Sequence, residues 1–241
     1  MRTSVASAFL CFVFAPFGVF CTAWTFIFVS RGEYLSAVVA LGFAFLTLGL
    51  VLMLAIVASR KVQPRVRREE GGIMVRPDRR VDNLLMASTF GGFLAMAFYA
   101  IFAPLDMIAI RVQRNDERYF VFACAAAVLV GIFSLVQIIR RRGTNYVRMT
   151  ADGLEMGNTV SSAERSWNDV TDVADRAQNS RHPSGTTYIK TADERTRIIP
   201  SDWYTPGGYA LRELVRFYWK HPEDREELTD GRALQRIETE S

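Results

Sequence analysis

The chain has 241 residues, half of them hydrophobic, and a mean hydropathy of +0.10, which is unusual for a soluble domain but ordinary for a membrane protein with a soluble part. Charge is divided unevenly: residues 1–142 hold 16 basic and 8 acidic side chains, whereas residues 143–241 hold 13 and 17. Composition therefore indicates a basic membrane part followed by an acidic soluble part. The three cysteines, Cys11, Cys21 and Cys124, lie in apolar runs away from histidine, so neither a disulfide framework nor a zinc site is expected.

Four apolar segments predict membrane-spanning helices at about residues 7–29, 34–58, 84–103 and 119–139. Each is close to the length of about 20 apolar residues that a bilayer needs, and none contains Asp, Glu, Lys, Arg or His. That absence matters because a charge at the bilayer centre costs several kcal/mol. The first segment is expected to be an anchor and not a cleaved signal peptide, since its apolar run is long and no small-x-small site follows it.

Pro104 bears on the end of the third helix. Proline lacks an amide proton and clashes with the preceding turn, so the helix is expected to stop near Ala103 and to leave Asp106 at the membrane interface. The alternative is a helix over residues 84–110, with Asp106 near the end of the span.

A basic cytoplasmic loop, residues 59–83, is expected between the second and third helices. Its stretch 60–80, RKVQPRVRREEGGIMVRPDRR, contains eight basic and three acidic residues, and an arginine triplet at 140–142 follows the fourth helix. Short loops rich in Lys and Arg stay in the cytoplasm, so both clusters and both termini are expected on the cytoplasmic side of a bacterial inner membrane. The loop around residues 111–118 is also basic and would lie outside, against this rule.

Anionic lipid headgroups are the expected partners of these cations, at about 1 kcal/mol per basic residue near the surface. Nucleic acid is not expected, because the run lies between membrane helices, holds no aromatic side chain and matches no reading motif. A protein partner is the alternative. The candidate headgroup contacts are Arg65, Arg67, Arg68, Arg79, Arg80, Arg140, Arg141 and Arg142.

Small residues predict where the helices pack, because they let two backbones approach closely in lipid. Packing within one bundle is the expected use, and a homodimer face is the alternative. The candidate packing residues are Gly91 and Ala95 on the third helix, and Ala123, Ala127 and Gly131 on the fourth.

After the fourth helix the pattern changes to short strands. NYVRM and LEMG flank the turn at 152–153 and predict a hairpin, and RSW and VTDV around residues 168–169 predict a second pair. Two further strands are expected, TTYIK at 186–190 and TRIIP at 196–200. The polar stretch 176–185 is expected to be a mobile loop.

A helix is expected after the strands. One helical face is apolar, with Leu211, Leu214, Val215 and Tyr218. A second short helix is expected from Pro222, since proline suits the first helical position and the acidic residues after it suit a helix N-terminus. The soluble part is thus expected to be a domain over 143–220 and a helical tail over 221–241.

The segments RMTADGLEMG, SWNDVTDV, TTYIK with TRIIP, and LRELVRFYWKHPEDREEL together resemble the bacterial pleckstrin-homology-like (PH-like) domains of small membrane proteins. The resemblance implies a seven-stranded, strongly bent sheet capped by a C-terminal helix, whereas at most six strands are visible in the sequence. It also implies a binding or scaffolding module. The predicted fold is therefore an α+β membrane protein, with four transmembrane helices followed by a small PH-like antiparallel β domain.

Eukaryotic relatives in this fold often hold phosphoinositides in a basic pocket. This domain is net acidic, so such a pocket would need Arg148, Lys190, Arg195 and Arg197 close together. Arg195 and Arg197 are separated by one residue and would share a strand face, which makes them further candidate headgroup contacts. A solvated strand edge is the alternative.

No catalytic or metal-binding set is visible. The chain lacks a Gly-x-Ser-x-Gly elbow, a His-Glu-x-x-His motif, a phosphate-cradling Gly-rich loop and a Cys-x-x-Cys pair, and its spans lack the ionisable groups that transporters use. The expected function is that of a non-enzymatic membrane protein, without cofactor or metal, that presents a binding or scaffolding domain to lipid, a protein partner or a second copy. The alternative is an accessory subunit of a membrane enzyme or transporter, with the helices as the interface.

Overall fold

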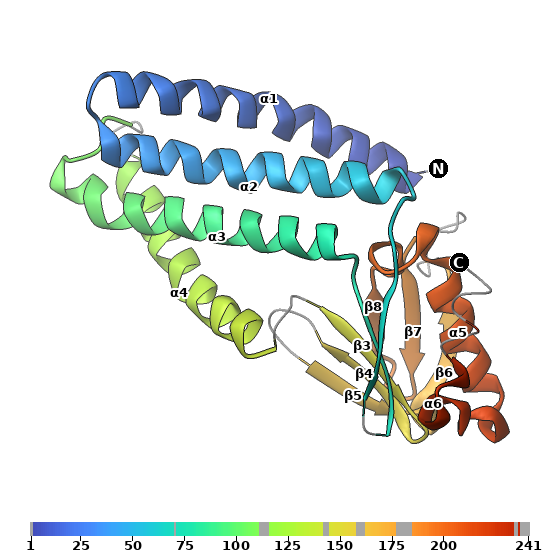
Figure 1. Ribbon diagram of the computed structural model, residues 1–241. Helices are drawn as coiled ribbons and strands as arrows, with labels where there is room; N and C mark the ends of the chain where they lie inside the picture. The colour runs from blue at the N-terminus through green and yellow to red at the C-terminus, as the bar shows by residue number, and fades with distance from the viewer. Residues whose placement is uncertain are drawn as a thin grey trace. The chain divides into compact units, whose positions relative to one another are not determined.

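The computed structural model describes residues 2–69, 71–110, 116–141, 145–157, 162–176, 185–233 and 236. It combines long helices with two antiparallel sheets, so the protein is of the α+β class (Figure 1). The chain divides into two compact units. Unit 1 contains Met1–Ser7, Ala55–Asp82 and Gly143–Ser241, and unit 2 contains Ala8–Leu54 and Asn83–Arg142.

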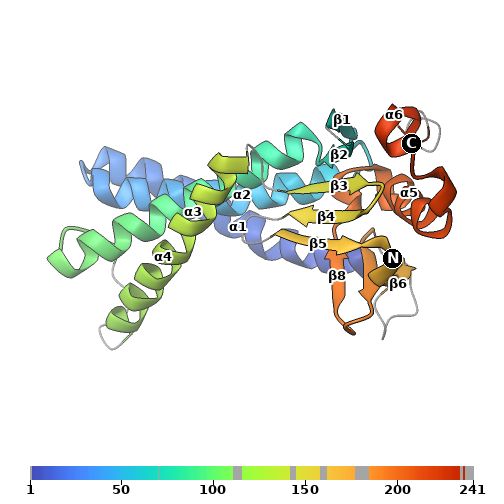
Figure 2. The ribbon, with the colours of Figure 1, turned by 90° about the horizontal axis from the view of Figure 1, so that it is seen from below.

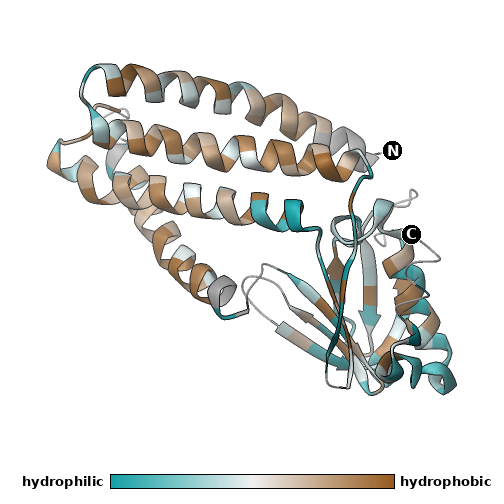
Figure 3. Cartoon of the chain, in the orientation of Figure 1, coloured by the Kyte–Doolittle hydropathy of each residue, from teal (hydrophilic) through white to brown (hydrophobic). Residues whose placement is uncertain are grey.

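Four helices are long and apolar enough to cross a membrane, which confirms the four predicted spans as apolar helices. They are α1 (Arg2–Ser30), α2 (Tyr34–Ala58), α3 (Arg79–Phe102) and α4 (Glu117–Arg141). Figure 3 shows hydrophobic residues along most of each helix and a hydrophilic first turn on α3. Helix α3 begins at Arg79 and not at residue 84, because the Asp78 side chain accepts a hydrogen bond of 2.7 Å from the amide of Arg80 and caps the helix.

The end of α3 agrees with the first of the two predicted boundaries. The α-helix stops at Phe102, and Pro104 lies in the following 3-10 turn. Asp106 comes after that turn in a left-handed conformation with φ of 55°, and its side chain is exposed. The carboxylate therefore lies outside the third helix.

Helices α2 and α3 pack through small residues within unit 2. A Cβ atom added to Gly42 would lie 2.6 Å from the Gly91 carbonyl oxygen and 2.8 Å from the Cβ of Ala95. Ala95 is completely buried. Gly91 and Ala95 thus allow a close approach of the two backbones, as small residues do in membrane bundles.

The small residues of α4 do not form one packed stripe. Gly131 faces α3, since a Cβ atom there would lie 2.7 Å from the Phe93 ring. Ala127 is half-buried, but Ala123 is exposed and its neighbour Cys124 is buried instead. The packed face of α4 is therefore offset from the predicted stripe at its N-terminal end.

Unit 1 contains a five-stranded antiparallel sheet with the strand order β1-β2-β3-β4-β5. Figures 1 and 2 show β3, β4 and β5 side by side. The strands are β1 (Arg65–Glu69), β2 (Gly72–Arg76), β3 (Tyr146–Thr150), β4 (Gly153–Gly157) and β5 (Ser162–Ser166). The hairpin predicted around residues 152–153 is present as β3 and β4.

Residues 65–69 and 72–76, within the segment predicted as the basic loop 59–83, form strands β1 and β2, which were not predicted. Gly71 makes the turn with φ of 78°, and β2 then pairs with β3 from Gly72 opposite Thr150 to Val75 opposite Val147. Ile73 and Val75 are completely buried in the core. Residues 72–75 are a short continuous run of buried residues, which the surrounding charges made hard to recognise as a strand in the sequence.

A second, three-stranded sheet has the order β6-β7-β8, with β6 (Val170–Ala174), β7 (Thr187–Thr191) and β8 (Thr196–Ile199). The predicted strands at 186–190 and 196–200 are therefore present. The predicted pairing of β5 with β6 is wrong, because the two strands belong to different sheets. Trp167 between them is buried and donates a 2.8 Å hydrogen bond from Nε1 to the Thr150 carbonyl, which turns the chain into the second sheet.

Helix α5 (Tyr209–Lys220) has the predicted apolar face, and all four residues of that face are buried. Its side chains also close the free edge of β6: Trp219 Nε1 donates to the Val170 carbonyl at 2.9 Å, and Arg216 Nη2 donates to the Val173 carbonyl at 3.0 Å. These bonds occupy two backbone carbonyls of β6 that an additional strand would need for pairing.

The C-terminal tail belongs to the same core. Its described residues form a 3-10 turn, η5 (Pro222–Asp224), and a short helix, α6 (Glu227–Asp230), and residues 232, 233 and 236 are also helical. Leu228 and Ala233 are nevertheless completely buried, and Arg236 binds the Glu227 carboxylate through two hydrogen bonds of 2.7 and 3.0 Å. The remaining 3-10 turns are η1 (Ala103–Leu105), η2 (Trp167–Asp169), η3 (Ser201–Trp203) and η4 (Pro206–Gly208).

The soluble domain thus differs from the predicted range 143–220, because it includes β1 and β2 at one end and the tail at the other. The predicted loop 176–185 lies outside the described residues except for its two ends.

We expect the fragment 143–241 to lack a cooperative unfolding transition. It loses Ile73 and Val75, whose burial contributes about 1.5–3 kcal/mol each, a large part of the ~5–15 kcal/mol that stabilises a domain. Joining residues 60–78 to residues 145–241 through a Gly/Ser linker should restore a cooperative melt, followed by circular dichroism. Equal melting of both proteins would show that β2 is dispensable.

Candidate membrane-surface site

The arginines of the 60–80 run have two different roles. Arg65 and Arg68 hold the structure together: Arg65 donates from Nε to the Pro77 carbonyl at 2.8 Å and pairs with Asp82 at 3.1 Å, and Arg68 donates to the Thr229 carbonyl at 2.5 Å. Arg76 is half-buried and its Nε lies 3.3 Å from the Met74 sulfur. The other five cations are exposed and have no carboxylate partner within the described part of the chain: Arg60, Lys61, Arg67, Arg79 and Arg80.

Asp78 organises the segment that joins β2 to α3. Its carboxylate accepts from the Arg80 amide at 2.7 Å and from the Gln63 amide at 2.8 Å, and its own amide donates to the Trp203 carbonyl at 3.0 Å. Asp78 is 5% exposed. One buried residue therefore ties together the chain after α2, the start of α3 and the segment after β8.

Four exposed cations, Arg60, Lys61, Arg79 and Arg80, lie around this joint, and we call them the basic collar. Arg60 and Lys61 follow the end of α2, and Arg79 and Arg80 begin α3. Because Gln63 and Arg80 both bind Asp78, the two pairs are held at one end of unit 1.

Two aromatic side chains belong to the same end of unit 1. Trp203 is half-buried and Tyr209 is 58% exposed. A Cβ atom added to Gly207 would lie 3.9 Å from Arg60 Nε, so the segment that carries both aromatics passes beside the collar. Cations combined with Trp and Tyr are typical of membrane–water interfaces.

Two further predicted arginines are exposed in the described structure. Arg67 is exposed on β1, and Arg140 is exposed near the end of α4. The Arg141 side chain and the whole of Arg142 lie outside the described residues.

The four cations of the possible headgroup pocket each lie near a carboxylate or the core, so they leave no shared basic pocket among the described residues. Arg148 lies 3.9 Å from Glu69 and from Glu155, and Lys190 lies 3.7 Å from Asp172. Arg195 lies 3.7 Å from Asp193 and precedes β8, so it does not share that strand with Arg197. Arg197 is half-buried, and its Nε is enclosed without a hydrogen-bond partner.

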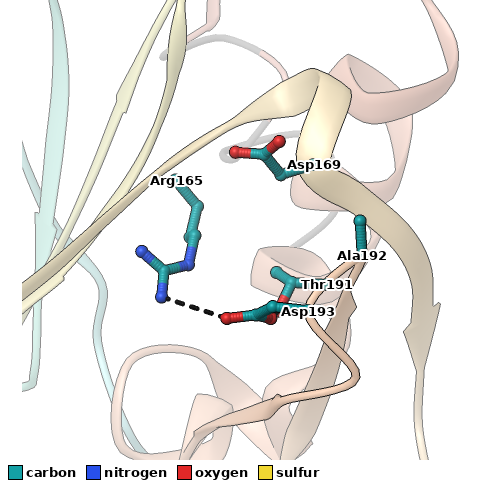
Figure 4. Close-up of a pocket in the computed structure, with 5 residues that line it drawn as sticks. All are labelled: Arg165, Asp169, Thr191, Ala192 and Asp193. Carbon is teal, nitrogen blue, oxygen red and sulfur yellow. Dashed lines mark hydrogen bonds and ion pairs between the residues drawn. The ribbon is translucent and has the colours of Figure 1, made fainter.

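A separate pocket of about 470 Å³ lies in unit 1 between η2, the end of β5 and the turn from β7 to β8 (Figure 4). Its lining combines both charges, with Arg165 3.5 Å from Asp193 and the Asp169 carboxylate on the opposite wall. The Thr191 hydroxyl donates to Asp193 and, with help from Arg165, lowers the pKa of that carboxyl. The pocket lies at the end of the five-stranded sheet where Gly153 of β4 pairs with Ser166 of β5. Helix α3 follows β2 at the opposite end of that sheet.

One group of side chains has atoms close enough to share a metal ion. His221, Glu223 and Asp224 bring potential ligand atoms within 4.8 Å of one another. His221 Nδ1 already lies 3.2 Å from Glu223, and both residues are exposed. The geometry is that of a solvated turn at the start of the tail.

Among the described carboxyl groups, Asp202 is the one whose pKa is clearly raised. Burial raises its pKa to about 6, although its own backbone amide and the nearby Arg212 guanidinium favour the charged form. It lies in η3, next to Trp203. A raised pKa alone does not make it a functional group, since structural acids are perturbed in the same way.

Comparisons with protein-family models, with curated proteins and with solved structures found no match. The chain is therefore described by its own features, as an α+β protein with four apolar helices and a basic collar on its soluble unit. Sequence reasoning found the cations of α3 but missed Arg60, Lys61 and Tyr209 as parts of the same surface. The Asp78 contacts that unite them are non-local, so no sequence signal identifies them.

Replacing Asp78 with alanine should destabilise the full chain by about 1–3 kcal/mol, because it removes the cap of α3 and leaves the partly buried amides of Gln63 and Arg80 without their acceptor. The measurement is thermal unfolding in mild detergent. Glu164→Ala, at an exposed position of the edge strand β5, is the control and should leave the melting temperature unchanged. Equal effects of the two substitutions would contradict the role of Asp78.

Asp202→Asn should raise the melting temperature at pH 7.5 and leave it unchanged near pH 4. The folded pKa of about 6 lies above the ordinary value of 3.8, so the stability that Asp202 provides is present below pH 4 and lost as pH rises to 6. Asp152→Asn, at an exposed position, serves as the control. A constant difference between wild type and Asp202→Asn at all pH values would contradict this assignment.

Proposed function

We propose that this chain is a non-enzymatic integral membrane protein that presents a PH-like binding or scaffolding domain at the cytoplasmic surface of a bacterial inner membrane. The support for PH-like identity is the order of elements in unit 1. Four consecutive antiparallel strands, β2 to β5, precede a three-stranded sheet, β6 to β8, and a closing helix, α5. That order fits the seven strands and C-terminal helix of the resembling family, with β1 as an addition.

The pairing of β2 with β3 is the observation that carries the proposal. The two strands are neighbours in one sheet, although α3 and α4 lie between them in the chain. If both helices cross the bilayer, both strands return to the same side, and α1 and α2 bring the N-terminus there too. The positive-inside rule then assigns that side to the cytoplasm, because the collar and Arg140 flank the spans there.

The proposal of a binding role, in place of a catalytic one, rests on residue types. The sequence carries none of the nucleophile, metalloprotease or phosphate-loop motifs named above. The ionic groups that line the pocket in unit 1 bind one another or face solvent. The lining residues are Arg165, Asp169, Thr191, Ala192 and Asp193. Such a surface suits contact with a partner.

One observation favours the alternative of an accessory subunit. Only 6% of the candidate span of α4 is buried within the described chain. Its exposed apolar residues include Phe122, Leu129 and Val130, at 77%, 71% and 64%. This face would contact either lipid or a helix of a partner, and a partner helix would make the helices the functional interface.

Cysteine labelling tests the orientation in whole cells. Single cysteines at Arg31, in the turn between α1 and α2, and at Lys220, at the end of α5, are introduced after the three native cysteines are replaced with alanine. A membrane-impermeant maleimide should modify position 31 and spare position 220 until the membrane is broken. Modification of position 220 in intact cells would contradict the cytoplasmic assignment.

Purification in mild detergent separates the two functions. The main proposal predicts that the protein is isolated without a membrane protein in equal amount. A stoichiometric membrane partner, released by charged substitutions at Leu129 and Val130, would establish the accessory role instead. Glu164→Lys with Thr196→Lys, both exposed in unit 1, provides the control for added charge.

A further inference from the structure

We propose that the basic collar binds the phosphate groups of anionic phospholipids, an inference that rests on the proposed membrane-surface function and adds a ligand to it. The collar differs from the set of arginines that the sequence indicated. It includes Arg60 and Lys61 and excludes Arg65 and Arg68, whose guanidinium groups bind carbonyls and a carboxylate of the protein.

The dipole of α3 opposes the positive charges of Arg79 and Arg80. Both lie in the first turn of α3, where the helix dipole favours negative groups and disfavours cations. Asp78 forms no ion pair with either arginine in the described structure, and its two carboxylate oxygens accept hydrogen bonds from the backbone amides of Gln63 and Arg80. Asp82, the acidic residue of that turn, pairs with Arg65. An anionic surface beside the two arginines would remove the conflict.

Arg60 also occupies a position that its side chain type does not favour. It has φ of 54° immediately after the last turn of α2, a left-handed conformation that glycine or asparagine normally supplies. Its side chain is exposed and has no carboxylate partner in the described structure. A ligand that binds the positive charge of Arg60 would explain why arginine occupies this strained position. Departures from local preference are expected at functional sites.

The placement of the collar along the chain identifies the source of the phosphate. Arg60 is separated by one residue from the end of α2, and Arg79 is the first residue of the candidate span of α3. Cations at the ends of spanning segments lie at the depth of lipid headgroups. The exposed Tyr209 beside them suits that depth as well. The collar therefore faces bilayer lipid and not a free anion in solution.

The test measures lipid preference by native mass spectrometry of the full chain. Detergent-solubilised protein is mixed with equal amounts of phosphatidylglycerol and phosphatidylcholine, and the bound ratio is recorded. The wild type should favour phosphatidylglycerol by about tenfold, given the known attraction of juxtamembrane cations. The collar variant, with Gln at Arg60, Lys61, Arg79 and Arg80, should bring that ratio close to one.

A charge-matched control separates a site from net charge. Its four Gln substitutions are at exposed cations elsewhere in unit 1, namely Arg67, Arg176, Arg195 and Lys220. It should keep the wild-type ratio. If the four-residue collar variant fails to fold, Arg79→Gln with Arg80→Gln replaces it and should lower the ratio about threefold.

Three results would overturn the inference: a wild-type ratio close to one, an equal loss in the control variant, or loss of the preference when inorganic phosphate is added. The last result would mean that free anions, and not lipids, bind the collar. None of them alters the labelling pattern at positions 31 and 220, so the collar can fail while the proposed orientation stands.

Discussion

The hydrogen-bonded pairing of β2 with β3 is the constraint on which the rest of the structure depends. These strands are contiguous in the sheet, from Gly72 opposite Thr150 to Val75 opposite Val147, but α3 and α4 separate them in sequence. Ile73 and Val75 complete a core to which Val147 and Met149 belong from the other side of that separation. The soluble unit is therefore assembled from two parts of the chain, and its closure requires that both reach the same side of the membrane.

The joint at Asp78 gives that constraint a functional consequence. The Asp78 carboxylate caps α3 and accepts a hydrogen bond from the Gln63 amide, and the Asp78 amide donates to the Trp203 carbonyl. Three chain segments therefore meet between the end of β2 and the start of α3. Their meeting gathers Arg60, Lys61, Arg79 and Arg80 on one end of unit 1. A sheet built from separate segments thus creates a cationic surface that no single segment contains. The mixed-charge pocket lies at the opposite strand ends of the same unit.

Sequence patterns predicted what local physics determines. The four helices follow from long charge-free runs, the β3–β4 hairpin from its Asp-Gly turn, and α5 from apolar residues at helical spacing. Non-local contacts explain the errors. The strands β1 and β2 were obscured by their arginines, and β5 and β6 were paired because the buried Trp167 that divides the sheets looks like part of a strand. The candidate site was only partly predictable, since charge alone cannot distinguish Arg65, bound to Asp82, from the exposed Arg79.

Disulfide trapping in intact membranes tests the central claim most directly. With the native cysteines replaced, Met74→Cys and Arg148→Cys place thiols on directly opposed residues of β2 and β3, at a separation suited to a disulfide. Mild oxidation should form a disulfide between these two cysteines efficiently. The control pair, Met74→Cys with Glu164→Cys, lies three strands apart in the sheet and should not form a disulfide. Failure of the 74–148 pair to form, in protein that is correctly inserted, would contradict a sheet that spans the α3–α4 insertion.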